Sequence, residues 1–133
     1  MYAIIRTTLF TIALIAFTVS CNAQSTKSGY EDKKVEEVVN MSNQNNVVMI
    51  DVRTPGEVAN GYLKGTDHFF DISSSNFAKN IDQLDRDKTY VLICASGARS
   101  QRAARYMLEQ GFSNVINMSG GMRMVRNSDY ISR

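Results

Sequence analysis

Histidine and cysteine are scarce in this sequence, and their scarcity excludes several kinds of chemistry. The 133 residues contain one histidine, His68, and two cysteines, Cys21 and Cys94. A structural zinc site takes several cysteine or histidine ligands, so no metal centre is predicted, and no other cofactor is indicated. Two cysteines, one of them near the N-terminus, do not make the disulfide framework of a small secreted domain.

An excess of charge of one sign is also absent. Fifteen Lys and Arg residues stand against thirteen Asp and Glu residues, which leaves a net charge of +2. The sequence has no dense basic stripe, so no nucleic-acid partner is predicted. Apolar residues make up 44% of the chain and charged residues 21%, which is the balance of a globular protein, and the length suits one domain with one hydrophobic core.

The first 23 residues have the order of a bacterial export signal. Arg6 precedes an uncharged apolar run over residues 7–19, and small residues follow. This order is typical of a signal peptide, and the run is short for a span of a lipid bilayer. The segment that ends at Cys21 resembles a bacterial lipobox, although Thr18 stands at the usual leucine position. The resemblance implies cleavage before Cys21 and lipidation of that cysteine; cleavage after Ala23, which would discard Cys21, and an uncleaved anchor are the alternatives.

Either cleavage predicts an exported protein on the periplasmic or outer-surface side of a bacterial membrane. The lipidated form would be anchored to that membrane. Residues 24–32 are small and polar, so they are expected to form a tether between the leader and the domain. The domain itself is expected over residues 33–133.

The remaining sequence alternates apolar runs with amphipathic segments. Short runs rich in β-branched residues predict strands, and apolar residues at helical spacing predict helices. The expected strands are 47–52, 68–72, 90–94 and 115–118, and the expected helices are 35–42, 76–84, 100–110 and a last one after Gly120 and Gly121. Continuous apolar strands are typical of a sheet that is buried on both faces. The predicted fold class is therefore α/β, a single domain with a central parallel sheet of four to five strands and helices on both faces.

The segment from Cys94 to Ser100 joins the clearest strand to the next helix. The first N–H groups of a helix lack intrahelical partners and lie at the positive end of its dipole. Because small residues and Gly97 allow a tight turn, these groups are expected to converge on the sulfur of Cys94 and to favour its thiolate. Arg99 adds a permanent positive charge, and Ser100 is placed to cap the helix or to donate to an anion. The alternative is a free cysteine that is simply buried at a strand end.

At these residues the chain resembles the rhodanese (sulfurtransferase) family. The loop is similar to that family's active-site loop, in which four residues separate the cysteine from the arginine. Residues 50–57 and 61–66 are similar to a stretch in which Asp-Val-Arg and Glu precede a Gly-His motif. The pair Gly120-Gly121 resembles the family's late double-glycine turn. The three motifs occur in the family's order, and the resemblance covers residues 35–127.

The resemblance implies a role for each motif. Cys94 would attack a sulfur donor such as thiosulfate, carry the sulfur as a persulfide and pass it to a thiol or cyanide acceptor. The backbone N–H groups of the loop would hold the persulfide, and Arg99 would orient an anionic sulfur donor. Asp51 and Arg53 would support the loop from the neighbouring strand, unless they form an ordinary surface ion pair. The implied binding residues are Ala95, Ser96, Gly97, Ala98, Arg99 and Ser100, and no metal ligand is among them.

Three positions depart from the family pattern. Tyr62 stands where the family usually has histidine, Thr66 where it usually has alanine, and Val125 near the usual tryptophan. These departures leave the expected fold and the role of Cys94 intact. They affect the expected preference for a sulfur donor.

Two other functions are compatible with the fold that the resemblance implies. Phosphatases and arsenate reductases of this fold have loops that are one residue longer, with room for a tetrahedral oxyanion. A noncatalytic binding or thiol-redox module would use the fold to recognise a partner, but inactive members usually lack the cysteine, which this chain keeps. The loop therefore favours sulfur transfer over both.

Overall fold

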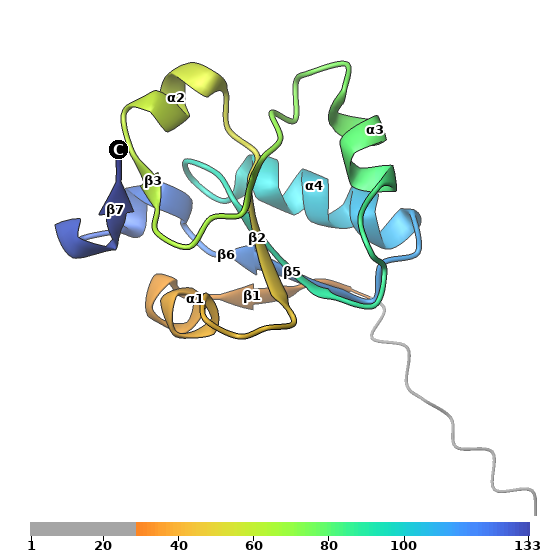
Figure 1. Cartoon of the computed structure of the whole chain (residues 1–133), viewed down its shortest axis with the longest axis horizontal. Helices are drawn as coiled ribbons and strands as arrows, with labels where there is room; N and C mark the ends of the chain where they lie inside the picture. Colours follow the sequence, from red (N-terminus) through yellow and green to blue (C-terminus); the bar gives the residue numbers. More distant parts are fainter. Residues whose placement is uncertain (1–28) are drawn as a thin grey trace, which may run out of the picture.

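The computed structural model describes residues 29–133, so the leader, Cys21 and most of the expected tether lie outside the described residues. A parallel sheet with the strand order β1-β6-β5-β2-β4 forms the centre of the domain (Figure 1). Its strands are β1 (Glu31–Lys33), β2 (Val47–Asp51), β4 (His68–Phe69), β5 (Thr89–Ile93) and β6 (Asn114–Met118). The predicted α/β fold with a central parallel sheet is confirmed.

Helices cover both faces of this sheet. α1 (Val35–Met41) packs on one face, and α3 (Phe77–Asp82) and α4 (Ala98–Glu109) pack on the other (Figure 1). These helices begin and end within two residues of their predicted bounds. A short helix that the sequence did not predict, α2 (Pro55–Ala59), follows the end of β2.

The side chains of β5 show why its sequence is a continuous apolar run. Tyr90 and Leu92 pack into the core beneath α3 and α4, whereas Val91 and Ile93 pack into the core beneath α1. Successive side chains of a strand point to opposite faces, so a strand covered on both sides needs apolar residues at every position. Cys94 continues this alternation on the α4 side and belongs to the same core.

Strand β1 corrects the predicted start of the domain. The sequence predicts a tether through residue 32, but Glu31 and Asp32 belong to β1, which pairs in parallel with β6. An edge strand is paired on one side only and can carry polar side chains toward solvent. Its sequence therefore lacks the apolar run of a buried strand, and the prediction was wrong at this point.

The C-terminal segment also differs from the prediction. In place of a last α-helix, the chain forms two short 3-10 helices, η1 (Gly121–Met124) and η2 (Ser128–Tyr130), and a strand β7 (Ile131–Ser132). This strand pairs antiparallel with β3 (Tyr62–Leu63). The residues after the double glycine include no apolar repeat at helical spacing, so nothing in them supports a long helix.

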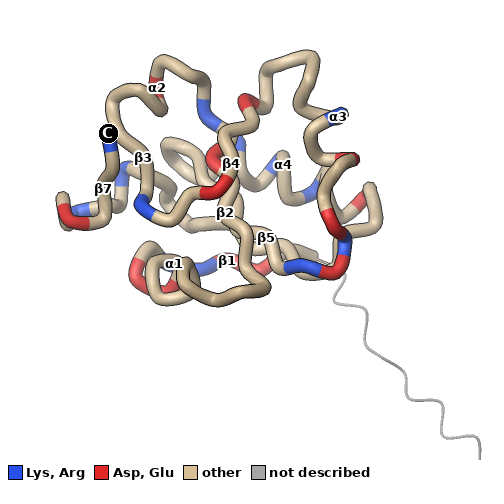
Figure 2. The backbone as a smooth tube through the Cα atoms, in the orientation of Figure 1, with Lys and Arg blue, Asp and Glu red and all other residues tan. Residues whose placement is uncertain are grey.

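Charged side chains of both signs are distributed over the described part of the chain. Figure 2 shows acidic and basic residues scattered along the backbone. Within residues 29–133, no helix has the length and apolar character needed to cross a membrane.

Gly121 packs directly against the segment that follows β5. Its φ is +62°, in the left-handed region. A Cβ at this position would overlap the carbonyl oxygen of Cys94 and would lie within 2.7 Å of both carbonyl atoms of Ala95. The second glycine of the motif is therefore required by a close approach of two backbone segments.

Replacing Gly121 with alanine should lower the free energy of unfolding by about 2 kcal/mol or more, because left-handed strain and a backbone clash add together. Gly56→Ala is the matched control: a Cβ on Gly56 meets no atom within 4 Å, and alanine favours the helix in which it lies. Urea unfolding measures both variants. If the Gly121 variant were as stable as the Gly56 variant, the close approach would not constrain this turn.

Candidate active site

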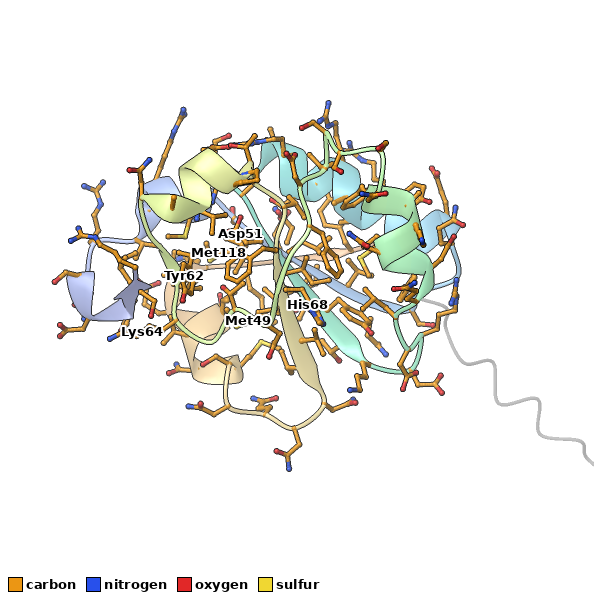
Figure 3. All side chains as sticks on the ribbon, turned by 45° about the horizontal axis from the view of Figure 1, so that its top comes forward. Met49, Asp51, Tyr62, Lys64, His68 and Met118 are labelled. Atoms are coloured by element: carbon orange, nitrogen blue, oxygen red, sulfur yellow. The ribbon has the colours of Figure 1, made fainter. Side chains whose placement is uncertain are left out.

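Asp51 and Cys94 lie at the carboxyl ends of two neighbouring strands. Asp51 is the last residue of β2, and Cys94 follows directly after β5; Figure 3 shows Asp51 in the interior of the molecule. From β2 the chain continues to the edge strand β4, whereas from β5 it continues to β6 on the other side. In parallel sheets such a divergence opens a crevice at the strand ends, where ligands bind. Both residues therefore flank the place where this fold class builds its sites.

The loop after β5 wraps closely around the sulfur of Cys94. The N–H group of Gly97 donates to Cys94 Sγ over 3.0 Å, and Ser100 Oγ lies 3.3 Å from the same atom. Gly97 is the N-cap residue of α4 and has a φ of +96°, a conformation that glycine reaches without strain. This turn aims the start of α4 at the sulfur.

Two hydrogen bonds hold the carbonyl groups of the loop away from the sulfur. The N–H of Met122 donates to the carbonyl oxygen of Cys94 over 2.8 Å, and the N–H of Arg123 donates to that of Ala95 over 3.0 Å. In a trans peptide the N–H points opposite to the carbonyl. The N–H of Ser96 consequently points away from η1, and it helps to lower the pKa of the Cys94 thiol.

Burial and hydrogen bonding act on the Cys94 thiol in opposite directions. Cys94 has 0% exposed surface, and burial raises the pKa of the thiol because a buried thiolate loses its hydration. Hydrogen bonds from the Ser100 hydroxyl and from the N–H groups of Ser100, Ser96 and Gly97 lower it, and the resulting pKa lies below the ordinary value. A thiolate is the form that a nucleophilic cysteine needs. Because the sulfur is covered, a reactant reaches it only after surrounding groups move apart.

The guanidinium of Arg99 is paired with a carboxylate of α2. Its Nη1 donates to Glu57 Oε2 over 2.7 Å and its Nη2 donates to Glu57 Oε1 over 2.6 Å. Thr54 and Glu57 form a capping box that fixes this carboxylate at the start of α2. Hydrogen bonding to Arg99 lowers the pKa of Glu57 to about 2 and raises that of Arg99. Arg99 therefore ties α4 to α2 beside the loop.

Asp51 and Arg53 form a second, buried ion pair. Asp51 is 0% exposed and Arg53 7%, so the alternative of an ordinary surface pair is wrong. The Nη2 of Arg53 donates to Asp51 Oδ2 over 2.7 Å and to the carbonyl oxygen of Gly61 over 2.9 Å. The Nε of Arg53 donates to the same carboxylate over 3.0 Å. The pair thus fixes the path of the chain from β2 around α2 to β3.

Comparison with known families agrees with this geometry. The sequence pattern described as "Rhodanese-like domain" matches residues 34–128, which is most of the chain. The chain belongs to the rhodanese-like domain family. The match includes β2, the Cys94 loop and the double glycine, which are the segments described above.

Several named relatives and solved structures are similar to this domain. The chain is 34% identical over 94 residues to the thiosulfate sulfurtransferase GlpE of Shewanella oneidensis, covering 71% of this chain and 90% of that protein. It is 36% identical over 81 residues to the protein of the same name from Pseudomonas entomophila, covering 61% and 72%. The crystal structure of a rhodanese-like domain protein from Staphylococcus aureus has a TM-score of 0.61 and 25% identity, covering 74% of this chain and 93% of that chain.

The structure brings some of the predicted site residues of this rhodanese-like domain together and leaves others apart. The donors directed at the sulfur come from Ser96, Gly97 and Ser100. Arg99 borders the loop but is engaged by Glu57. The hydrogen bonds of Arg53 run to Asp51 and to the α2–β3 connection. The predicted lipidation site, Cys21, lies outside the described residues.

Two polar residues that contribute to the site, Glu57 and Asn117, were not predicted from the sequence. Glu57 lies in the motif similar to the family's, but its partner is 42 positions away. Asn117 is fully buried in β6 and accepts a hydrogen bond from Ser100 over 2.6 Å. Its signal was available, because a polar side chain interrupts an otherwise apolar run from Val115 to Met118.

Glu57→Gln should reduce stability near neutral pH and have less effect in acid. Because the pKa of folded Glu57 is lowered to about 2, the ion pair stabilises the fold fully above the unfolded-state pKa of about 4.3 and loses this contribution as the pH falls toward 2. For a partly exposed pair, we expect about 1 kcal/mol at pH 7, measured by urea unfolding at a series of pH values.

Glu109→Gln is the control for this experiment, since Glu109 is exposed near the end of α4. It should change stability little at any pH. A Glu57 variant whose stability differed from the parent by the same amount at pH 3 and pH 7 would contradict a contribution from the ionised pair.

Proposed function

We propose that this chain is a sulfurtransferase that carries sulfane sulfur as a persulfide on Cys94, with thiosulfate as a suitable sulfur donor and a thiol or cyanide as acceptor. The observation that carries the proposal is the convergence of hydrogen-bond donors on one buried sulfur. The names of the relatives, thiosulfate sulfurtransferases, support the same reaction and donor class.

The geometry supports a reaction in two displacements. The Cys94 thiolate attacks the outer sulfur of thiosulfate, a new S–S bond forms, the S–S bond of thiosulfate breaks, and sulfite leaves with the bonding electron pair. A thiolate or cyanide acceptor then attacks the terminal sulfur, and Cys94 leaves as a thiolate. The N–H groups of the loop are already oriented toward this charge, so they stabilise it without reorganisation.

Arg99 contributes in two ways under this proposal. Its pairing with Glu57 holds α2 against the loop, and its charge acts on the sulfur of Cys94 from the start of α4. An anionic sulfur donor would share the guanidinium with Glu57. Asp51 and Arg53 act indirectly, because their ion pair fixes the connection that positions α2.

Incubation of the purified domain with thiosulfate should add the mass of one sulfur atom to Cys94, and addition of cyanide should release thiocyanate and restore the original mass. Intact-mass spectrometry and a thiocyanate assay measure the two steps. Cys94→Ser should lose both the sulfur addition and the thiocyanate release, because a serine hydroxyl does not replace the thiolate as the nucleophile that carries the sulfur.

The same samples separate the other interpretations. A noncatalytic binding module would gain no sulfur, and a phosphatase would instead hydrolyse an aryl phosphate offered in place of thiosulfate. Transfer by the Cys94 variant at the rate of the parent would end the proposal that this cysteine is the nucleophile.

Export and anchoring are a separate part of the proposal. The order of Arg6, the apolar residues 7–19 and Cys21 supports cleavage before Cys21, lipidation of this cysteine, and a position on the periplasmic or outer-surface side of a bacterial membrane. The lipid would then join the membrane to the domain through the segment between Cys21 and β1. Such a placement lets the domain meet small sulfur donors outside the cytoplasm.

Intact-mass spectrometry of the protein from a bacterial host that processes lipoproteins tests this part. We expect the mass of a chain that begins at Cys21 and carries acyl groups, and Cys21→Ala should abolish the acylation. A product that begins at Gln24 would contradict the lipid anchor while keeping export, and an unprocessed chain would contradict both cleavages.

A further inference from the structure

One amide side chain is buried within an apolar strand close to the catalytic loop. Asn117 has 0% exposed surface and lies in β6 between Ile116 and Met118. Burying an amide is costly unless both of its polar ends are hydrogen-bonded. Here both are: Nδ2 donates to Asp32 Oδ1 over 2.6 Å, and Oδ1 accepts from Ser100 Oγ over 2.6 Å.

The partners of Asn117 impose a direction on this chain of hydrogen bonds. An ionised carboxylate only accepts, so the NH₂ group of Asn117 must face Asp32 and its carbonyl oxygen must face Ser100. That oxygen also only accepts, so the Ser100 hydroxyl is the donor in this contact. Asp32 lies in the edge strand β1, opposite Asn117 in the strand register. A residue at the edge of the sheet thereby sets the orientation of a buried hydroxyl.

The Ser100 hydroxyl carries one hydrogen but has three acceptors within reach. Asn117 Oδ1 lies at 2.6 Å, the carbonyl oxygen of Gly97 at 3.0 Å and Cys94 Sγ at 3.3 Å. While the hydrogen points to Asn117, the hydroxyl presents its lone pairs to the sulfur. This arrangement suits a thiol, which can donate to them, and opposes a thiolate. To stabilise a thiolate, the hydroxyl must turn away from Asn117.

We propose that Asn117 is a positioning residue that, held by Asp32, competes with the sulfur of Cys94 for the hydroxyl hydrogen of Ser100. The backbone N–H groups of the loop are fixed donors, whereas this hydroxyl is an adjustable one. The inference rests on the proposed function only in taking Cys94 as the reacting group.

The other charged groups near the sulfur are arranged in pairs. Arg99 of α4 is held by Glu57 of α2, and Arg53 is held by Asp51 at the end of β2. Asp32, on β1, is linked to the site by its hydrogen bond with Asn117. Because both arginines are already paired with carboxylates, the Ser100 hydroxyl is the donor that can rotate toward the sulfur when the sulfur is charged and away from it when it is neutral.

Asn117→Leu removes the competing acceptor at nearly the same side-chain volume. The freed hydroxyl should donate to the sulfur, and the pKa of Cys94 should fall by about half a unit to one unit. Ultraviolet absorbance of the thiolate against pH measures this pKa without a reactant, with Cys94→Ser as the blank. Asn114→Leu, on the exposed start of the same strand, is the matched control and should leave the pKa unchanged.

A double-mutant cycle separates positioning from a general structural effect. Ser100→Ala should raise the pKa of Cys94. Adding Asn117→Leu to it should cause no further shift, because the hydroxyl hydrogen for which Asn117 and Cys94 compete is absent. An equal shift from Asn117→Leu in both backgrounds would overturn the inference, because the effect would not pass through Ser100.

Asp32→Ala tests the same inference at an exposed edge position, so it does not depend on whether the Asn117 variant folds. Without the carboxylate, the amide is free to turn its NH₂ group toward Ser100, and the pKa of Cys94 should fall again. No shift in Asp32→Ala would overturn the role of Asp32 and with it the inference. The titration uses no sulfur donor, so its outcome is independent of sulfur transfer. If the pKa shifts occur as expected but no sulfur is transferred, only the proposed function is contradicted. If sulfur is transferred but the pKa shifts do not occur, only this inference is contradicted.

Discussion

The structure around the site depends on the balance between burial and hydrogen bonding at the sulfur of Cys94. Cys94 is fully buried, and burial on its own favours the neutral thiol. The loop offsets this cost with backbone N–H groups, which are available because the carbonyls of Cys94 and Ala95 are bound by η1. Gly97 provides the turn at one end of the loop, and Gly121 allows η1 to approach at the other. These two glycines, which lie in separate segments of the sequence, therefore both shape the surroundings of the Cys94 sulfur.

Two ion pairs surround the loop without adding net charge. Asp51 with Arg53 secures the chain as it leaves β2, and Glu57 with Arg99 joins α2 to α4. The Asp51–Arg53 pair is buried, so removing either partner would leave an uncompensated buried charge, whereas the Glu57–Arg99 pair is partly exposed. Burial raises the pKa of Cys94, and hydrogen bonds from backbone N–H groups and from one hydroxyl lower it. A site of this kind suits a reaction in which charge moves between sulfur atoms.

The sequence predicted the parts of the fold and the site that local patterns determine. Strand β5 could be recognised because burial on both faces demands a continuous apolar run, and the Cys94 loop because a strand, a small flexible turn and a helix follow one another directly. Strand β1 could not be recognised from the sequence, because its pairing with β6 depends on residues more than eighty positions away. The same reason hid the pairing of Arg99 with Glu57: a fork of two hydrogen bonds across 42 positions leaves no local pattern. The helix α2 was missed because five residues are too few to show a period.

The difference between fixed and adjustable donors explains why a buried polar chain would accompany the loop. Amide N–H groups cannot turn away, so they favour the charged sulfur at every stage of a reaction cycle. During sulfur transfer the negative charge leaves Sγ for the terminal sulfur and then returns, and donors that all remained on Sγ would oppose the first of these steps. A hydroxyl with a second acceptor can withdraw its hydrogen when the charge moves and return it later, at the cost of exchanging one hydrogen bond for another. Ser100, placed between Cys94 and Asn117, is a group with that freedom.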